Sequence, residues 1–306
     1  MNLIETFRSE LFRNFEIFED SVYLGEDVRN AHRGIAIGMH ERFGDNKILD
    51  MPISESAFTG LGLGMAIMGK NVFVEYNFAG LVYLGLDQIF NQAHKFNEML
   101  NTDLDLRITY ILPTGTRGGL AGHHSDNPYA LLSHLGIKSL MPTNAFDCKK
   151  IFEHIEKEPV PTAIFLPVSS FFNHYGSEIQ EHNYWGIYKL KSGNKINVIC
   201  TGTTLNLIME VLEENKKLTP NVYILTDLSF SKETIDFLRF LEKSPTIFID
   251  DSFERCGLSS EVQKYISKDV QFQSLTRKSK NISFAEDLEN EIIVSKKRIE
   301  ETLLTL

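Results

Sequence analysis

Two short apolar runs decide the fold predicted for this chain: NVFVEY at positions 71–76 and RITYIL at positions 107–112. Both are rich in β-branched and aromatic residues, and both have the length of a strand buried on its two faces. The stretch between them carries apolar residues at helical spacing, namely Leu86, Ile89, Phe90, Ala93, Phe96, Met99 and Leu100. A strand, a helix and a second strand in this order predict a parallel pair joined by a crossover helix.

The same alternation continues along the rest of the chain. Further strand-like runs lie at 162–168, 196–201, 221–226 and 245–250, with amphipathic stretches at 205–218 and 232–241. A chain of 306 residues has the length of about two domains. The polar, glycine-containing stretch 173–195 separates two α/β blocks. The sequence therefore predicts an α/β fold with domains at 1–175 and 190–306, each a mostly parallel sheet flanked by helices.

Composition narrows the class of function. A net charge of −10 argues against a nucleic-acid or anionic-membrane surface, because phosphate binding relies on clustered lysines and arginines. The one basic cluster, RKSK at 277–280, is short and is interpreted as a solvated loop. No apolar run approaches the length of a membrane span, and the N-terminus has no signal-peptide pattern. The cysteines, Cys148, Cys200 and Cys256, show no CxxC spacing, which argues against a disulfide framework or a zinc site and fits a cytoplasmic protein.

Several glycine-containing motifs have structural interpretations. GLGLGM at 60–65 lacks the GxGxxG spacing of a dinucleotide loop, so its glycines are expected to allow close helix packing. GTRGG at 115–119 lacks the ending of a Walker loop, and we interpret it as a flexible loop that brings the next residues into a cleft. CTGTT at 200–204 marks a strand-to-helix turn that suits either an anion site or a plain helix cap.

Glu55 stands between a strand-like segment and a long Gly/Ala-rich apolar helix. That placement suggests a buried acid, and buried acids often take part in chemistry. A helix cap or a solvated loop charge is the commoner role for a lone glutamate at the end of a strand. The spacing of Glu55 to the motifs described below favours chemistry.

Two adjacent histidines, His123 and His124, begin the motif HHSD. Adjacent side chains point apart, so a single metal ion rarely binds both. One acid/base histidine beside a structural neighbour is the better interpretation. A triad of Ser125, His124 and Asp126 is disfavoured, because three consecutive residues do not normally reach the required geometry.

Four motifs occur in the order and approximate spacing of one family: GEDV at 25–28, PISE at 52–55, DQIFNQA at 87–93 and HS at 124–125. With them the chain resembles the beta subunits of the thiamine-diphosphate-dependent first component of 2-oxo acid dehydrogenase complexes. More distantly it is similar to the middle and C-terminal domains of transketolase and deoxyxylulose-phosphate synthase. GLSSE at 257–261 and FAEDLE at 284–289 extend the likeness over nearly the whole chain.

The resemblance implies roles for two catalytic residues and two pocket residues. Glu55 matches the glutamate that hydrogen-bonds a ring nitrogen of the cofactor's aminopyrimidine. His124 matches the family's active-site histidine, which acts in proton transfer or charge stabilisation. His123 and Ser125 are assigned to the substrate pocket.

The chain departs from the family at three places. The helix expected at 148–157 ends in EKEP, at 156–159, without a clear match to the ligands of the family's structural potassium site, and the other two departures are single positions. Leu81 stands where the family usually has an aromatic residue that stacks on the pyrimidine, with Phe78 and Tyr83 as the nearby aromatic candidates for cofactor contact. Ile111, two residues before a proline, stands where the family often has arginine.

The resemblance also implies a cofactor and a partner. The cofactor is thiamine diphosphate, and its Mg²⁺ is held mainly by an alpha-type subunit, because GDN at 44–46 does not continue as the Gly-Asp-Gly motif of the diphosphate site. We therefore expect no metal ligands in this chain, an alpha2beta2 heterotetramer, and a lipoyl acyltransferase core as a further partner. The C-terminal domain is expected to support assembly. The implied activity is oxidative decarboxylation of a 2-oxo acid; a split transketolase-like or carboligating subunit and a non-catalytic assembly partner remain alternatives.

Overall fold

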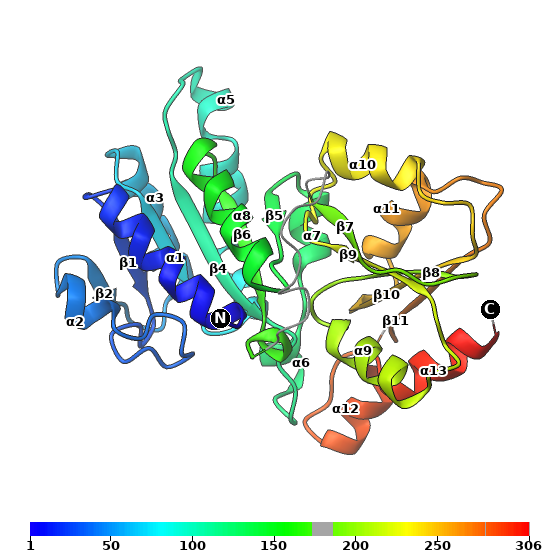
Figure 1. Ribbon diagram of the computed structural model, residues 1–306. Coiled ribbons are helices and arrows are strands. Elements are labelled where there is room, and N and C mark those ends of the chain that lie inside the picture. Colours follow the sequence, from blue (N-terminus) through cyan, green and yellow to red (C-terminus); the bar gives the residue numbers. More distant parts are fainter. Residues whose placement is uncertain (173–185, 279, 306) are drawn as a thin grey trace.

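The N-terminal half folds around a six-stranded sheet whose strands all run parallel (Figure 1). The computed structural model describes residues 1–172, 186–278 and 280–305. The strand order is β2-β1-β3-β4-β6-β5, with β1 at Val22–Gly25, β2 at Ile48–Asp50, β3 at Val72–Glu75, β4 at Ile108–Thr114, β5 at Lys138–Leu140 and β6 at Thr162–Pro167. The predicted strands β3, β4 and β6 are confirmed. Strands β1, β2 and β5 were not predicted; β2 and β5 have only 3 residues each, too few for an apolar pattern to reveal them.

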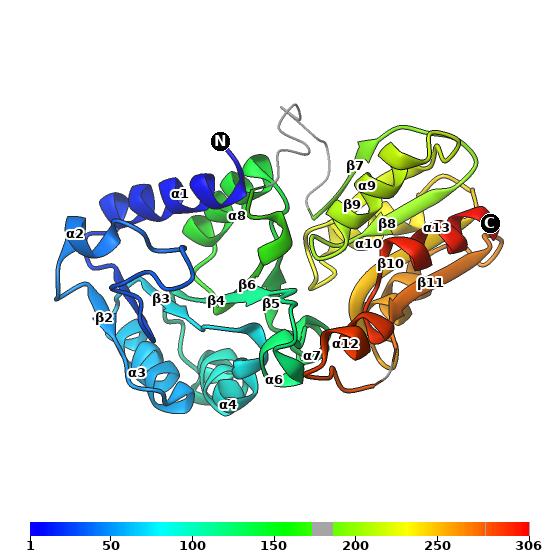
Figure 2. The same ribbon diagram turned by 90° about the horizontal axis from the view of Figure 1, so that it is seen from below.

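Helices cover both faces of this sheet, as Figure 2 shows. On one face lie α1 (Leu3–Ile17) and α8 (Ala145–Lys157), and on the other lie α3 (Glu55–Ile67) and α4 (Val82–Leu86). Phe7 of α1 and Phe152 of α8 meet edge to face with their ring centroids 5.2 Å apart. A parallel sheet covered on both faces accounts for the continuous apolar runs from which its central strands were predicted.

Close packing of α3 against β3 depends on Gly62. A Cβ atom at this position would lie 2.8 Å from Cγ2 of Val74, which is too close for any side chain. Gly60 faces the side chain of Gln88 at 3.3 Å, whereas nothing lies within 4 Å of Gly64. The interpretation of these glycines as packing residues is confirmed for Gly62 and wrong for Gly64, whose helix face is exposed to solvent.

The crossover between β3 and β4 is helical but irregular. Helix α4 continues into a π-helical segment, η2 (Asp87–His94), and then into α5 (Phe96–Leu100). The wider π-helical turn shifts the facing side chains relative to an α-helix, and such segments are frequent near functional sites. Apolar spacing predicted the helix but does not distinguish the two kinds of turn.

The C-terminal half contains a second sheet in the order β11-β10-β8-β9-β7, parallel except for the antiparallel edge strand β7. Its strands are β7 (Ile187–Lys191), β8 (Asn197–Cys200), β9 (Asn221–Leu225), β10 (Thr246–Phe253) and β11 (Phe272–Arg277). Its helices are α9 (Leu205–Glu214), α10 (Lys232–Arg239), α11 (Leu258–Tyr265), α12 (Glu286–Ile292) and α13 (Lys296–Thr305). The predicted strands β8, β9 and β10 are confirmed, as is the α/β class. Most of the stretch predicted to separate the domains, 173–185, lies outside the described residues.

A buried polar joint connects the two halves. The hydroxyl of Tyr129 donates to Oδ1 of Asp250 at 2.5 Å, and Thr201 donates to the same oxygen at 2.7 Å. Asn127 donates from Nδ2 to the backbone carbonyl of Asp251 at 2.8 Å. A buried carboxylate needs such partners, so these bonds fix the segment that follows β4 against the C-terminal sheet. None of the helices in the described ranges is long and apolar enough to cross a membrane.

Candidate active site

The candidate site lies at the carboxyl ends of the strands of the N-terminal sheet, where parallel α/β sheets usually bind ligands. Glu26 follows β1 directly, and Asn77 and Phe78 come shortly after β3. Glu55 is the first residue of α3, on the connection that follows β2. The parallel order of the strands thus brings together residues that are far apart in the sequence.

Glu55 is buried, with 5% of its surface exposed, which confirms the buried acid predicted from its position. It opens α3, where the helix dipole favours a negative charge. Glu55 also acts electrostatically on Glu26. Burial raises the pKa of Glu26, and the charge of Glu55 raises it further, whereas the hydrogen bond from Asn77 lowers it. The site therefore contains two interacting carboxyl groups.

Glu26 and Asn77 form a hydrogen-bonded pair beside Glu55. Nδ2 of Asn77 donates to Oε2 of Glu26 at 2.9 Å, and Glu26 is 9% exposed. Oε1 of Glu26 and Oδ1 of Asn77 are both buried without a hydrogen-bond partner among the described residues. An unpartnered buried acceptor is costly, so this pair suits a ligand that brings N–H or O–H donors. Sequence analysis noted Glu26 only as part of the motif GEDV and predicted no role for it, and it did not identify Asn77 as a site residue.

Phe78 contacts both a histidine and an arginine. Its ring centroid lies 4.4 Å from that of His124 and 3.6 Å from Cζ of Arg33. The Nε and Nη2 atoms of Arg33 are buried and have no partner among the described residues. Arg33 stands in no motif, so sequence reasoning missed it. The arrangement gives the site an aromatic surface with a cation close by.

His124 lies on α6 (Ala121–Ser125), with Nδ1 3.2 Å from the carbonyl oxygen of Leu120. This contact favours the tautomer in which Nδ1–H donates to the carbonyl and Nε2 keeps its lone pair. A histidine held in this way can accept or return a proton through Nε2.

The loop before α6 is held by the C-terminal domain. The backbone N–H groups of Gly118 and Gly119 donate to Oε2 of Glu289, at 2.9 and 3.0 Å. Nη2 of Arg117 lies 3.1 Å from Oδ2 of Asp251. The loop is therefore docked at both its arginine and its glycines, so the interpretation of GTRGG as flexible is wrong, whereas the expectation that it brings the next residues into a cleft is confirmed for His123. Loop docking of this kind depends on distant residues and has no local sequence signal.

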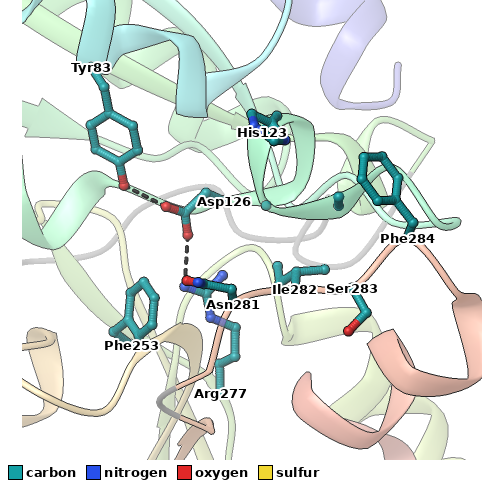
Figure 3. Close-up of a pocket in the computed structure, with 11 residues that line it drawn as sticks. Tyr83, His123, Asp126, Phe253, Arg277, Asn281, Ile282, Ser283 and Phe284 are labelled. Atoms are coloured by element: carbon teal, nitrogen blue, oxygen red, sulfur yellow. Dashed lines mark hydrogen bonds and ion pairs between the residues drawn. The ribbon is translucent and has the colours of Figure 1, made fainter.

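The two histidines have different surroundings, as expected for neighbours. His123 is exposed and lies near Phe284 with centroids 6.5 Å apart, on the wall of a cavity (Figure 3). Ser125 is 3% exposed, and its hydroxyl has no partner among the described residues. Asp126 bonds to Tyr83 and not to a histidine, in agreement with the rejection of a triad.

The three candidates for cofactor contact lie in different places. Leu81 ends a 3-10 turn, η1 (Ala79–Leu81), and packs against the hydrophobic core. Tyr83 directs its hydroxyl to Oδ2 of Asp126 at 2.6 Å. Of the three, Phe78 is the one that contacts His124.

Ile111 is fully buried in the middle of the sheet, paired with Glu75 of β3 and Ile164 of β6. No charged group reaches the site from position 111. Within the described ranges, no group of three His, Cys, Asp or Glu side chains gathers as metal ligands.

The basic cluster RKSK is not a solvated loop throughout. Arg277 ends β11 and is 1% exposed, and its Nη2 forms an ion pair with Oδ1 of Asp126 at 2.7 Å. The interpretation is wrong here because a partner from the other domain, invisible in the local sequence, makes burial of the guanidinium possible.

Comparison with known proteins identifies the family. Residues 6–172, more than half of the chain, match the transketolase pyrimidine-binding domain, and the chain belongs to this family. The beta subunit 2 of mitochondrial 2-oxoisovalerate dehydrogenase from Arabidopsis thaliana is 31% identical over 172 residues, covering 55% of this chain and 48% of that protein. The beta subunit of acetoin:2,6-dichlorophenolindophenol oxidoreductase from Bacillus subtilis is 23% identical over 286 residues, covering 89% and 83%.

Solved structures confirm the fold. A split-gene transketolase, determined as an inactive beta4 tetramer, has a TM-score of 0.74 at 15% identity, over 98% of this chain and 96% of its own. Transketolase from Leishmania mexicana has a TM-score of 0.75 at 12% identity, over 99% of this chain and 45% of its own. The match with several curated relatives spans about half of their length. The family resemblance predicted from the motifs is confirmed.

Proposed function

We propose that this chain is the beta-type subunit of a thiamine-diphosphate-dependent enzyme that decarboxylates a 2-oxo acid, an oxidoreductase of the pyruvate dehydrogenase kind. The observation that carries the proposal is buried Glu55 at the start of α3, beside the unpartnered acceptors of Glu26 and Asn77. Relatives that are beta subunits of pyruvate, 2-oxoisovalerate and acetoin enzymes support it.

The residues present fit an aminopyrimidine. Its N–H donors require buried acceptors, which Glu26 and Asn77 supply. The carboxyl group of Glu55 would hydrogen-bond a ring nitrogen. Phe78 offers a flat aromatic face, so we assign ring contact to it in preference to core-packed Leu81 or to Tyr83. Thiamine diphosphate, when bound, supplies the electron sink for decarboxylation.

His124 is the proposed proton-transfer residue. The Leu120 carbonyl holds Nδ1, and contact with Phe78 limits rotation of the imidazole. Nε2 can then take or return a proton at the substrate carbonyl. His123 and Ser125 remain the proposed residues of the substrate pocket.

A second subunit completes the proposed enzyme. The names of the relatives as beta subunits support pairing with an alpha-type chain, which would hold the diphosphate and Mg²⁺ in an alpha2beta2 assembly. A lipoyl acyltransferase core would be the further partner, and the assembly would be cytoplasmic.

The test is co-expression with the alpha-type chain, followed by measurement of thiamine-diphosphate-dependent decarboxylation across a panel of 2-oxo acids. Glu55→Gln is expected to lower kcat by about 10²- to 10⁴-fold, the usual size of an acid/base contribution. Exposed Glu41→Gln is the matched control and should retain full activity. Equal activity in the Glu55 variant and the wild type contradicts the proposed role.

A split transketolase-like or carboligating subunit is the second candidate. Buried Ile111 favours it, since that position offers no cation to a substrate carboxylate. Ketose phosphates tested as donors separate the two, because a dehydrogenase component should not use them. The third candidate is a non-catalytic assembly partner that has lost cofactor binding. Calorimetry of the assembled complex with thiamine diphosphate and Mg²⁺ tests it, because such a complex should show no binding of the cofactor.

A further inference from the structure

Helix α6 is attached to the C-terminal domain on both sides of His124. Two residues before the histidine, the backbone N–H of Gly122 donates to the carbonyl oxygen of Ile282 at 3.1 Å. Two residues after it, Oδ1 of Asp126 accepts from Nη2 of Arg277 at 2.7 Å. Arg277 ends β11, and Ile282 lies between β11 and α12. The position of His124 therefore depends on the end of the second sheet.

Asp126, which follows the last residue of α6, joins the two domains through its carboxylate (Figure 3). Oδ1 accepts from Arg277 and from the backbone N–H of Asn127 at 3.1 Å, and Oδ2 accepts from the Tyr83 hydroxyl at 2.6 Å. Burial raises the pKa of Tyr83, and the charge of Asp126 raises it further, so the hydroxyl keeps its proton and donates. The end of α6 is thus held by α4 from one domain and by β11 from the other.

Arg277 is itself fixed in place. It is 1% exposed, and its Cζ lies 3.9 Å from the centroid of the Phe253 ring, so the guanidinium rests on an aromatic face. Among the described residues its one hydrogen bond goes to Asp126, and Nε and Nη1 are buried without a partner. Burial of a guanidinium with so few bonds costs free energy, and a buried ion pair often adds little net stability. The pair therefore accounts better for the placement of α6 than for the stability of the fold.

We propose that Arg277 is a positioning residue, which acts through Asp126 to hold the imidazole of His124 in place. The inference rests on the proposed function for its consequence in proton transfer, and it gives the C-terminal domain a part in the site beyond the assembly role expected from the sequence. Arg277 contacts no substrate in this role. A displaced proton-transfer group slows the chemical step without weakening substrate binding to the same extent.

The test uses variants of the full chain that remove the ion pair. Arg277→Met leaves the Asp126 carboxylate without its cation, and thermal unfolding shows whether this variant folds. The double variant Arg277→Met/Asp126→Asn leaves neither charge unpaired, so it is expected to fold even if the single variant does not. Its asparagine still offers an oxygen to the Tyr83 hydroxyl. Lys278→Met removes an exposed cation at the next position and is the matched control.

Hydrogen exchange measures the attachment of α6 without any cofactor. In the double variant, the amides of residues 121–126 should exchange at least about tenfold faster than in the wild type, because the helix loses one of its attachments. Lys278→Met should change the rate by less than about twofold. Arg277→Lys should lie between them, since lysine keeps the charge but loses the planar guanidinium. Equal exchange in the double variant and the wild type overturns the proposal.

Decarboxylation by the complex with the alpha-type chain tests whether the ion pair acts through His124. The double variant should lower kcat by about tenfold to 10²-fold and change KM by less than about twofold. In a His124→Asn background the same change should lower kcat no further, because the group that it positions is gone. An equal loss of kcat in both backgrounds overturns the proposal, since the ion pair then acts by another route.

The proposal and the proposed function fail separately. Absence of thiamine-diphosphate-dependent decarboxylation by the wild-type complex overturns the proposed function, and hydrogen exchange still decides whether Arg277 holds α6. Faster exchange with unchanged kcat in the double variant overturns the positioning role and leaves the proposed function standing.

Discussion

The carboxyl edges of the two sheets both carry a pair of buried acids, but the acids differ in how their oxygens are used. In the second sheet, Asp250 accepts from Tyr129, Thr201 and Ser252, and Asp251 is partnered on both carboxylate oxygens. In the first sheet, Oε1 of Glu26 has no partner in the described structure, and neither does Oδ1 of the neighbouring Asn77.

This difference distinguishes the structural contact between the two domains from the candidate ligand-binding site. A fully partnered buried carboxylate holds two domains together, and removing it leaves several donors unsatisfied. A partly satisfied acid raises the free energy of the folded chain and suits a ligand that completes its hydrogen bonds. Acids in equivalent places on two similar sheets are therefore predicted to respond to mutation in opposite ways.

Asp250→Ala should have the largest effect on stability. It leaves the buried donors of Tyr129, Thr201 and Ser252 without their acceptor, and we expect the free energy of unfolding to fall by about 4 kcal/mol. Asp269→Ala, which removes a solvent-exposed ion pair with Lys243, should change it by less than about 1 kcal/mol. Urea unfolding measures both, and similar values for the two variants would refute the idea of a joint.

Glu75 should make stability depend on pH. Burial raises its pKa from 4.5 to about 7 although Tyr23 hydrogen-bonds to it. Its stabilising contribution is complete below about pH 4.5 and is lost as the pH rises through 7, because the folded protein holds the proton more tightly than the unfolded chain.

Glu75→Gln should therefore remove up to about 3 kcal/mol of the fall in unfolding free energy between pH 4.5 and pH 8. Buried Asp147, whose pKa is raised to about 6 by burial, changes stability in the same direction and leaves a residual slope. Urea unfolding at several pH values measures this, and identical slopes in variant and wild type would contradict the assignment.

Glu289→Gln should loosen the loop that leads to the histidines. The carboxylate accepts two backbone N–H bonds, from Gly118 and Gly119, and an amide oxygen accepts them less strongly. We expect a loss of about 1 to 2 kcal/mol and faster trypsin cleavage after Arg117. Exposed Glu286→Gln, on the same helix, is the control; equal cleavage rates in both variants would show that Glu289 does not hold the loop.

Glu26→Gln should have the smallest effect on stability, and with the opposite sign. Burial raises the pKa of Glu26, so an uncharged amide of similar shape should leave the unfolding free energy unchanged or raise it by up to about 1 kcal/mol at pH 8. Urea unfolding at this pH measures the difference. A large loss would show that Glu26 belongs to a joint, as Asp250 does.

Local sequence patterns predicted much of the fold and part of the site. Buried strands β3 and β4 stood out because each lies in a six-residue run rich in β-branched and aromatic side chains, and the burial of Glu55 followed from its place before an apolar helix. The roles of Glu55 and His124 remain predictions. Asn77 and Arg33 escaped detection because their only signal is the neighbours that the fold supplies.

The sequence by itself determined the α/β class, the family and the buried acid at the start of α3, because apolar periodicity and motif order are local properties of the chain. Only the tertiary structure decided which polar atoms keep a partner. It buried Arg277 in an ion pair with Asp126, and it docked the glycine loop on Glu289. The physical reason is that hydrogen bonding of a buried group depends on residues from distant parts of the chain, which only folding brings into contact.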